Sequence, residues 1–162
     1  MIIGAFMLCS LSSFKSGVCR IHSLEAACTV LEHMKGELCT SLLPLPQLFK
    51  RLSERLNGEA EDFSDELSRS LVNLGEENFS ALWEKSAKME LSYLNEEEMK
   101  SFLSLGLILG RFQLDIQLEA IEKTEKLLGE HLNSAKKSLP AEGKLRFGVS
   151  TGAAFLIVLW LL

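Results

Sequence analysis

Hydrophobic side chains recur at intervals of three and four residues through most of this 162-residue sequence, which is the spacing of one face of an α-helix. No stretch alternates hydrophobic and polar residues for long enough to predict a strand. The pattern predicts six amphipathic helices, at residues 20–38, 45–56, 60–73, 77–93, 95–110 and 113–138. The fold class is therefore expected to be all-α, an antiparallel helical bundle.

Residues that start or stop helices separate these segments. LLPLP at residues 42–46 predicts a tight reversal, because proline has no N–H group and restricts the residue before it. Asn95 followed by Glu98 predicts a capping box, which we favour over a metal site for this acidic first turn. Pro140 and Gly143 predict a joint after the sixth helix.

Gly106 and Gly110 lie four residues apart in the fifth segment. Residues with this spacing share one face of a helix. Inside a helix a glycine costs about 1 kcal/mol relative to alanine, which indicates a reason in packing. We therefore expect the two glycines to let another helix of the bundle approach closely.

The two ends of the chain carry no charge. All 17 basic and 22 acidic side chains lie within residues 15–146. Residues 1–14 and 147–162 are apolar, and we expect each to be a membrane segment. The second would be about 24 Å long as a helix against a hydrocarbon core of about 30 Å, a mismatch that bilayer thinning or snorkelling of Lys144 and Arg146 can cover. For residues 1–14, a removed signal peptide and an interfacial or core helix remain alternatives.

Basic residues flank both apolar ends on the side of the charged middle. Lys15 and Arg20 follow the first end, and Lys144 and Arg146 precede the second. Because such residues stay on the cytoplasmic side of a membrane, residues 15–146 are expected to be a cytoplasmic domain with both termini outside.

Composition narrows the range of functions. The net charge of −5 and the lack of a basic run make nucleic acid an unlikely partner. The four cysteines have no spacing typical of a zinc site, so we interpret them as free thiols and expect no metal or other cofactor. The sequence contains no glycine-rich phosphate loop, no HExxH motif and no nucleophile elbow. We therefore expect a protein that is not an enzyme.

Three stretches resemble the stage III sporulation protein AB family. ELCTSLLPL agrees with that family at Glu37, Pro44 and Leu45 and departs from it at Thr40 and Leu43. The last 19 residues, 144–162, resemble the basic-then-glycine C-terminal anchor of the family. The stretch LGLILGRFQLDIQLEAI has Gln113 in place of the usual Asp and agrees at Gly106, Leu109, Gly110, Gln117 and Ile121.

The resemblance implies a membrane protein of the mother cell, in the channel complex that joins it to the forespore. It implies a fold similar to the cytoplasmic domain of the type II secretion platform protein. The expected partners are other sporulation channel proteins and a cytosolic ATPase of the secretion type, and the expected location is the outer forespore membrane. Self-association is left open.

One acidic helix face is a candidate docking surface for such partners, although a solvated face would have the same composition. Its residues are Glu59, Glu61, Asp62, Asp65 and Glu66. The competing hypothesis is a tail-anchored helical regulator or adaptor, with residues 1–14 packed into the bundle. A periplasmic or secreted helical protein is a third.

Overall fold

The computed structural model describes the backbone of residues 2–41, 43–73 and 78–161, and the side chains of residues 15–41, 43–72 and 78–138. Within these ranges all regular secondary structure is helical, which confirms the all-α prediction. Two 3₁₀ turns are present, η1 (Leu71–Asn73) and η2 (Leu105–Leu107). The α-helices are α1 (Ile2–Ser41), α2 (Leu45–Ser53), α3 (Glu59–Ser70), α4 (Phe79–Glu90), α5 (Glu96–Ser104) and α6 (Leu114–Leu161).

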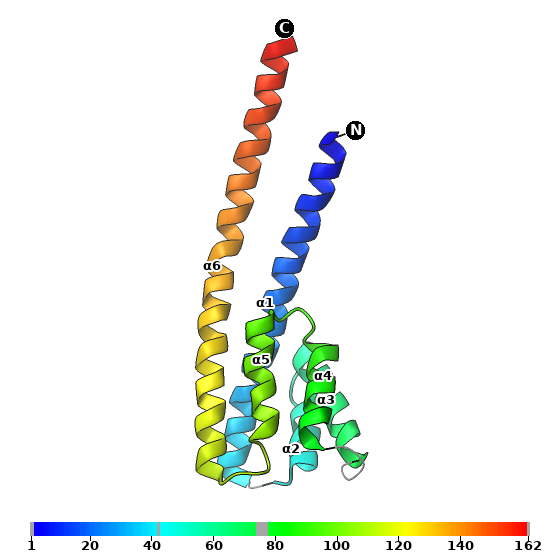
Figure 1. Ribbon diagram of the computed structural model, residues 1–162, viewed down its shortest axis with the longest axis vertical. Helices are drawn as coiled ribbons and strands as arrows, with labels where there is room; N and C mark the ends of the chain where they lie inside the picture. Colours follow the sequence, from blue (N-terminus) through cyan, green and yellow to red (C-terminus); the bar gives the residue numbers. More distant parts are fainter. Residues whose placement is uncertain (1, 42, 74–77, 162) are drawn as a thin grey trace.

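The two long helices, α1 and α6, run side by side in opposite directions (Figure 1). The short helices α2 to α5 form a compact part that packs against one end of this pair, with α3 lying against α1, α2 and α4. Beyond the compact part α1 and α6 project in the same direction. The start of α1 and the end of α6 therefore lie at the same end of the molecule (Figure 1).

An aromatic cluster forms the centre of the compact part. The Trp83 ring stacks on Phe102 with ring centroids 4.8 Å apart and meets the edge of Phe63 at 5.2 Å. Phe49 completes the cluster, and all four side chains are fully buried. The Trp83 indole N–H donates a 3.0 Å hydrogen bond to the carbonyl oxygen of Phe102, so the polar atom of this large side chain is satisfied.

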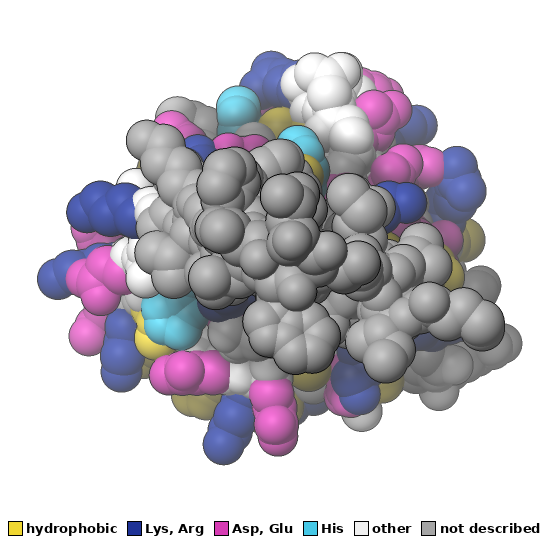
Figure 2. All heavy atoms as spheres, turned by 90° about the horizontal axis from the view of Figure 1, so that it is seen from above, with side chains coloured by type: hydrophobic (Ala, Val, Ile, Leu, Met, Phe, Trp, Pro, Cys, Tyr) yellow, Lys and Arg dark blue, Asp and Glu magenta, His cyan; other side chains and the backbone are white. Residues whose placement is uncertain are grey.

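The pair of long helices contributes an aliphatic layer to the same core. Its buried side chains are Leu24, Ala27, Leu31, Met34 and Leu38 of α1 and Ile121, Leu128 and Ala135 of α6. At the margins Lys35 lies 3.8 Å from Glu125, and Lys136 lies 2.6 Å from Glu25. Viewed along the projecting helices, charged side chains of both signs lie around the margin of the molecule (Figure 2).

The glycine prediction was wrong in its geometry. Helix α5 ends at Ser104, so Gly106 lies in η2 and Gly110 in the turn that follows, and the two do not share a helix face. Gly110 has a φ of +72°, a conformation that glycine adopts at little cost. A Cβ at Gly106 would lie 2.9 Å from the Trp83 Cδ1 atom. Gly106 thus permits the close approach of α4 through Trp83, so the expected approach of another helix is confirmed although the shared helix face is not.

Proline has different effects at the two ends of the bundle. As predicted, the chain reverses after α1, and Pro46 lies in the first turn of α2, where its missing N–H group has no partner to lose. The predicted joint at Pro140 and Gly143 was wrong, since the backbone of α6 remains helical through both residues. Helix α1 is longer than the predicted helix at residues 20–38, because its backbone is helical from Ile2 through Lys15 to Ser41.

Among the residues whose side chains are described, no helix includes a stretch that is long and apolar enough to cross a membrane. Segments 1–14 and 147–162, for which membrane crossing is predicted, lie outside those residues.

Candidate functional site

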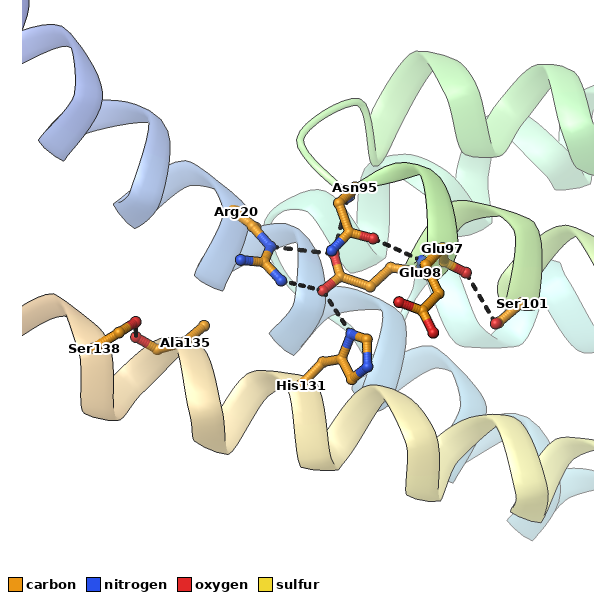
Figure 3. A network of polar contacts seen from close by, with 8 residues as sticks. All are labelled: Arg20, Asn95, Glu97, Glu98, Ser101, His131, Ala135 and Ser138. Carbon is orange, nitrogen blue, oxygen red and sulfur yellow. Dashed lines mark hydrogen bonds and ion pairs between the residues drawn. The ribbon is translucent and has the colours of Figure 1, made fainter.

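A buried carboxylate joins the two long helices to α5. Glu98 is fully buried and lies between Arg20 of α1 and His131 of α6, whose side chains both point toward it (Figure 3). One carboxylate oxygen accepts a 3.2 Å hydrogen bond from Arg20 Nε and a 2.9 Å bond from the backbone N–H of Asn95. The other accepts from Arg20 Nη2 and, at 3.0 Å, from His131 Nδ1. We call these residues the Glu98 clamp.

The capping box at the start of α5 holds this carboxylate in place. Asn95 accepts from the backbone N–H of Glu98, and Glu98 accepts from the backbone N–H of Asn95, which confirms the predicted cap. Burial on its own raises the pKa of Glu98, but the hydrogen bonds from Arg20, Asn95 and His131 together lower it below its ordinary value. The hydrogen bond to Glu98 in turn raises the pKa of Arg20. Glu98 and Arg20 are therefore both ionised at neutral pH.

A second carboxylate, Glu37, links α1 to α2 near the opposite end of the compact part. It is 7% exposed and accepts hydrogen bonds from Arg55 at 2.6 Å, from Arg51 at 3.0 Å and from Ser41 at 3.0 Å. Burial raises the pKa of Glu37, but Ser41 and the two arginines outweigh this and lower it. Glu37 was predicted as a motif residue, whereas its arginine partners were not.

Three of the motif residues meet at one corner of the bundle. A Cβ at Gly110 would lie 3.0 Å from the Leu45 Cδ1 atom, so α2 approaches this turn closely. The Gln117 amide accepts from the backbone N–H of Gly110 at 3.2 Å and donates to the carbonyl oxygen of Phe112 at 2.6 Å. Gln117 therefore braces the turn that Gly110 makes possible.

The remaining motif residues have packing positions. Pro44 is the N-cap residue of α2 and precedes Pro46 by two positions, so it fixes the start of that helix. Leu109 and Ile121 are buried in the core, and Gly106 lies against the Trp83 ring. In the structure these residues shape the bundle rather than line a cavity.

The predicted docking residues lie on α3, where Glu59 accepts a 2.6 Å bond from Ser23 and Asp65 pairs with Arg69. Burial raises the pKa of Glu90 on α4, and the negative charges of Asp62, Glu66 and Glu59 raise it further. The sequence did not indicate Glu90, because it belongs to a different helix. We define the acidic surface as Glu59, Glu61, Asp62, Asp65, Glu66 and Glu90.

Side chains that could bind a metal or act as a nucleophile are scattered over the part of the chain that the structure describes. Among the described side chains, no three His, Cys, Asp or Glu residues converge so as to hold a metal ion. A shallow hollow of about 330 Å³ lies between α1 and the start of α3, where an exposed His22 lies 3.8 Å from a half-buried Glu25. Burial, with Glu125 and Glu25 nearby, raises the pKa of the Cys28 thiol to about 11, so this thiol stays protonated and unreactive at neutral pH.

Comparison with known proteins gives the chain its family. The family model for stage III sporulation protein AB matches residues 1–161. The chain belongs to the stage III sporulation protein AB family. No curated protein matches the sequence. A solved structure titled stage III sporulation protein AB is similar with a TM-score of 0.65 and 17% sequence identity, covering 75% of this chain and 97% of that one.

Membership of the stage III sporulation protein AB family assigns the chain a role in sporulation. The solved relative shares its fold. Of the three stretches that resemble the family, the structure brings two together at the corner formed by Leu45, Gly110 and Gln117. The third stretch, residues 144–162, lies outside the described side chains.

Proposed function

We propose that the chain is a non-catalytic platform in the channel complex between mother cell and forespore. In this proposal residues 1–14 and 147–162 anchor it in the outer forespore membrane. The helical bundle then lies on the cytoplasmic side, in the mother cell, and both termini lie outside. The bundle would hold other channel proteins in position and present a docking surface to a cytosolic ATPase of the secretion type.

One observation carries the proposal: α1 and α6 project from the compact part in the same direction (Figure 1). Both apolar ends are therefore presented at one side of the bundle, where a single membrane can take up both. The Glu98 clamp connects the two helices near the point at which they leave the compact part. A bundle held at both ends keeps its surface near its membrane partners, which raises their effective concentration.

The acidic surface supports the choice of docking site. Burial and then the charges of Asp62 and Glu66 raise the pKa of Glu90, so negative charges from two helices act on the same region. Clustered charge of one sign attracts an oppositely charged partner over a distance comparable to the Debye length, about 8 Å at physiological salt. A basic surface on the ATPase would fit this region.

Co-purification from sporulating cells tests the docking role. The tagged full chain should recover the ATPase and other channel proteins from the membrane fraction. Asp62→Asn with Glu66→Gln should lower recovery of the ATPase several-fold and leave the membrane partners unchanged. Glu119→Gln with Glu130→Gln removes two exposed charges from α6 and serves as the matched control. Equal ATPase recovery with both double variants would reject this docking site.

Deletion of each apolar end tests the platform against the tail-anchored alternative. A platform held at both ends should resist extraction by alkaline carbonate in the full chain and become partly extractable when either end is removed. A tail-anchored regulator would be released only on removal of residues 147–162. The purified chain should hydrolyse no ATP, and turnover that follows this chain through purification would refute the non-catalytic role.

A further inference from the structure

An apolar turn is exposed at the end of the bundle opposite the projecting helices. Leu107 is 55% exposed, Phe112 52% and Ile116 45%. These three large side chains lie within ten residues, between α5 and the first turn of α6. We call residues 107–116 the α5–α6 turn. Contiguous exposed apolar side chains on a soluble surface commonly mark a site of protein contact.

The backbone of this turn is held firmly, so the exposed side chains are not those of a loose loop. Arg111 and Phe112 both donate backbone hydrogen bonds to the carbonyl oxygen of Ile108. The Gln117 side chain bonds to the backbone on both sides of Arg111, at Gly110 and Phe112. Leu109 is buried beneath the turn. A surface that is ordered before binding loses little conformational entropy when a partner covers it.

The charges on the turn bear on which kind of partner it fits. Arg111 and Asp115 are both exposed, have opposite signs and lie on either side of Phe112 in the sequence. Neither forms an ion pair with any other side chain that the structure describes. A surface with one charge of each sign beside an apolar centre is complementary to itself. In a twofold contact residue i meets residue j, and j meets i.

We propose that the α5–α6 turn is the contact surface for a second copy of this chain. In the dimer, Phe112 and its apolar neighbours pack about the twofold axis, and Arg111 of each copy faces Asp115 of the other. The turn carries one positive and one negative charge, so its net charge is zero and it offers no attraction to a strongly charged partner. The acidic surface, in contrast, would attract a basic partner. Three half-exposed side chains form a contact smaller than the standard interface of about 1,600 Å², so the association is weak.

Energy transfer between fluorophores measures this association in the full chain. Donor and acceptor dyes are attached to a single cysteine at Ser104, which is exposed beside the turn, in a chain whose four native cysteines are replaced by serine; they report dimers in a mild detergent. The wild type should associate. Arg111→Glu and Asp115→Arg should each weaken self-association at least tenfold, because each variant faces its own copy with two pairs of like charge.

Mixing the two charge variants gives the decisive result. An R111E copy and a D115R copy form two opposite-charge pairs, so their mixture should associate within about threefold of the wild type. Absence of transfer in the wild type would overturn the proposal. So would a mixture that associates no better than either variant alone.

Substitution of the apolar centre has a matched control on α4. Phe112→Ser should weaken association at least tenfold, whereas Met89→Ser, which alters a side chain that is 51% exposed elsewhere, should leave it unchanged. Both sites are exposed, so helicity by circular dichroism should equal that of the wild type. Equal loss of association in the two variants would show that the α5–α6 turn is not the contact surface.

Discussion

The compact part and the long helix pair are stabilised by different side chains. In the compact part four buried aromatic rings pack against one another, and Trp83 contacts the other three. Between α1 and α6 the buried side chains are aliphatic, and ion pairs such as Lys136 with Glu25 lie at the margins. Aromatic packing concentrates stabilisation in one place, whereas a long helix interface spreads it along its length.

The Glu98 clamp lies where these two regions meet. Glu98 itself belongs to α5 of the compact part, whereas Arg20 and His131 belong to the two long helices. Three groups of side chains therefore have different tasks. The aromatic centre stabilises the compact part, and the aliphatic layer holds α1 and α6 together. The Glu98 clamp joins the compact part to this helix pair. Each contribution can be removed separately.

Removing the aromatic centre should have the largest effect. Trp83→Ala deletes a fully buried indole and its hydrogen bond to Phe102, and should lower the free energy of unfolding by about 3–5 kcal/mol. Urea unfolding of the full chain in mild detergent measures this. Tyr93→Ala, at an aromatic residue that is 50% exposed, should change stability by less than about 0.5 kcal/mol. Similar losses in both variants would show that the cluster is not the centre of stability.

Removing the charge of the clamp should come next. Glu98→Gln keeps the size of the side chain but removes the counter-charge of Arg20, a guanidinium that is 36% exposed and so partly solvated, and should cost about 2–3 kcal/mol. Glu97→Gln changes the exposed neighbour and is the control. Spin labels on α1 and α6 should also report a broader distance distribution in the Glu98 variant, because the clamp positions both helices. An unchanged distribution would limit the clamp to a role in stability.

Filling the space at Gly106 should have a smaller effect. Gly106→Ala brings a methyl group within 2.9 Å of the Trp83 ring, and overpacking of this kind costs about 1–3 kcal/mol. Gly36→Ala is a matched substitution in α1 with nothing within 4 Å of the new Cβ. It should stabilise the chain by about 0.5–1 kcal/mol. The two variants should therefore shift the urea midpoint in opposite directions, and a shift of the same sign would contradict the close approach.

Acid should weaken the clamp gradually. The folded pKa of Glu98 is lowered, so its stabilising contribution is complete above the ordinary carboxyl pKa of about 4.3 and is lost as the pH falls through the folded pKa. The stability difference between wild type and Glu98→Gln should therefore shrink as the pH falls below about 4. A difference that grows on acidification would mean that the folded pKa is raised.

Local signals in the sequence predicted most of the helices but few of the contacts between them. The helix spacing of hydrophobic residues and the Asn95 cap depend on neighbours within one or two turns, and both predictions were confirmed. Arg20 and Glu98 are 78 positions apart, so no periodic pattern could pair them. Gly110 has a helix-like spacing from Gly106, and only the backbone shows that its φ is positive.

The sequence identified several residues of the candidate site but not the contacts between them. Asp62 and Glu66 were identified on one helix face, but Glu90 adds to them only because α4 packs on α3. Gln117 was identified by resemblance to the family. The structure adds that its side chain forms two hydrogen bonds to the backbone of the α5–α6 turn. At Pro140 the usual preference of proline for a helix boundary did not hold, since α6 continues past it.

Labelling of single cysteines tests the central claim, that both ends of the chain leave the bundle on the same side and anchor it in a membrane. In a chain whose four native cysteines are replaced by serine, one cysteine is placed at the N-terminus, at the C-terminus or at Glu61. Intact non-sporulating cells that produce each variant are then treated with a maleimide that does not cross membranes. We predict labelling at both termini and none at residue 61 until the cells are lysed. Labelling of residue 61 in intact cells, or a terminus labelled only after lysis, would contradict the account.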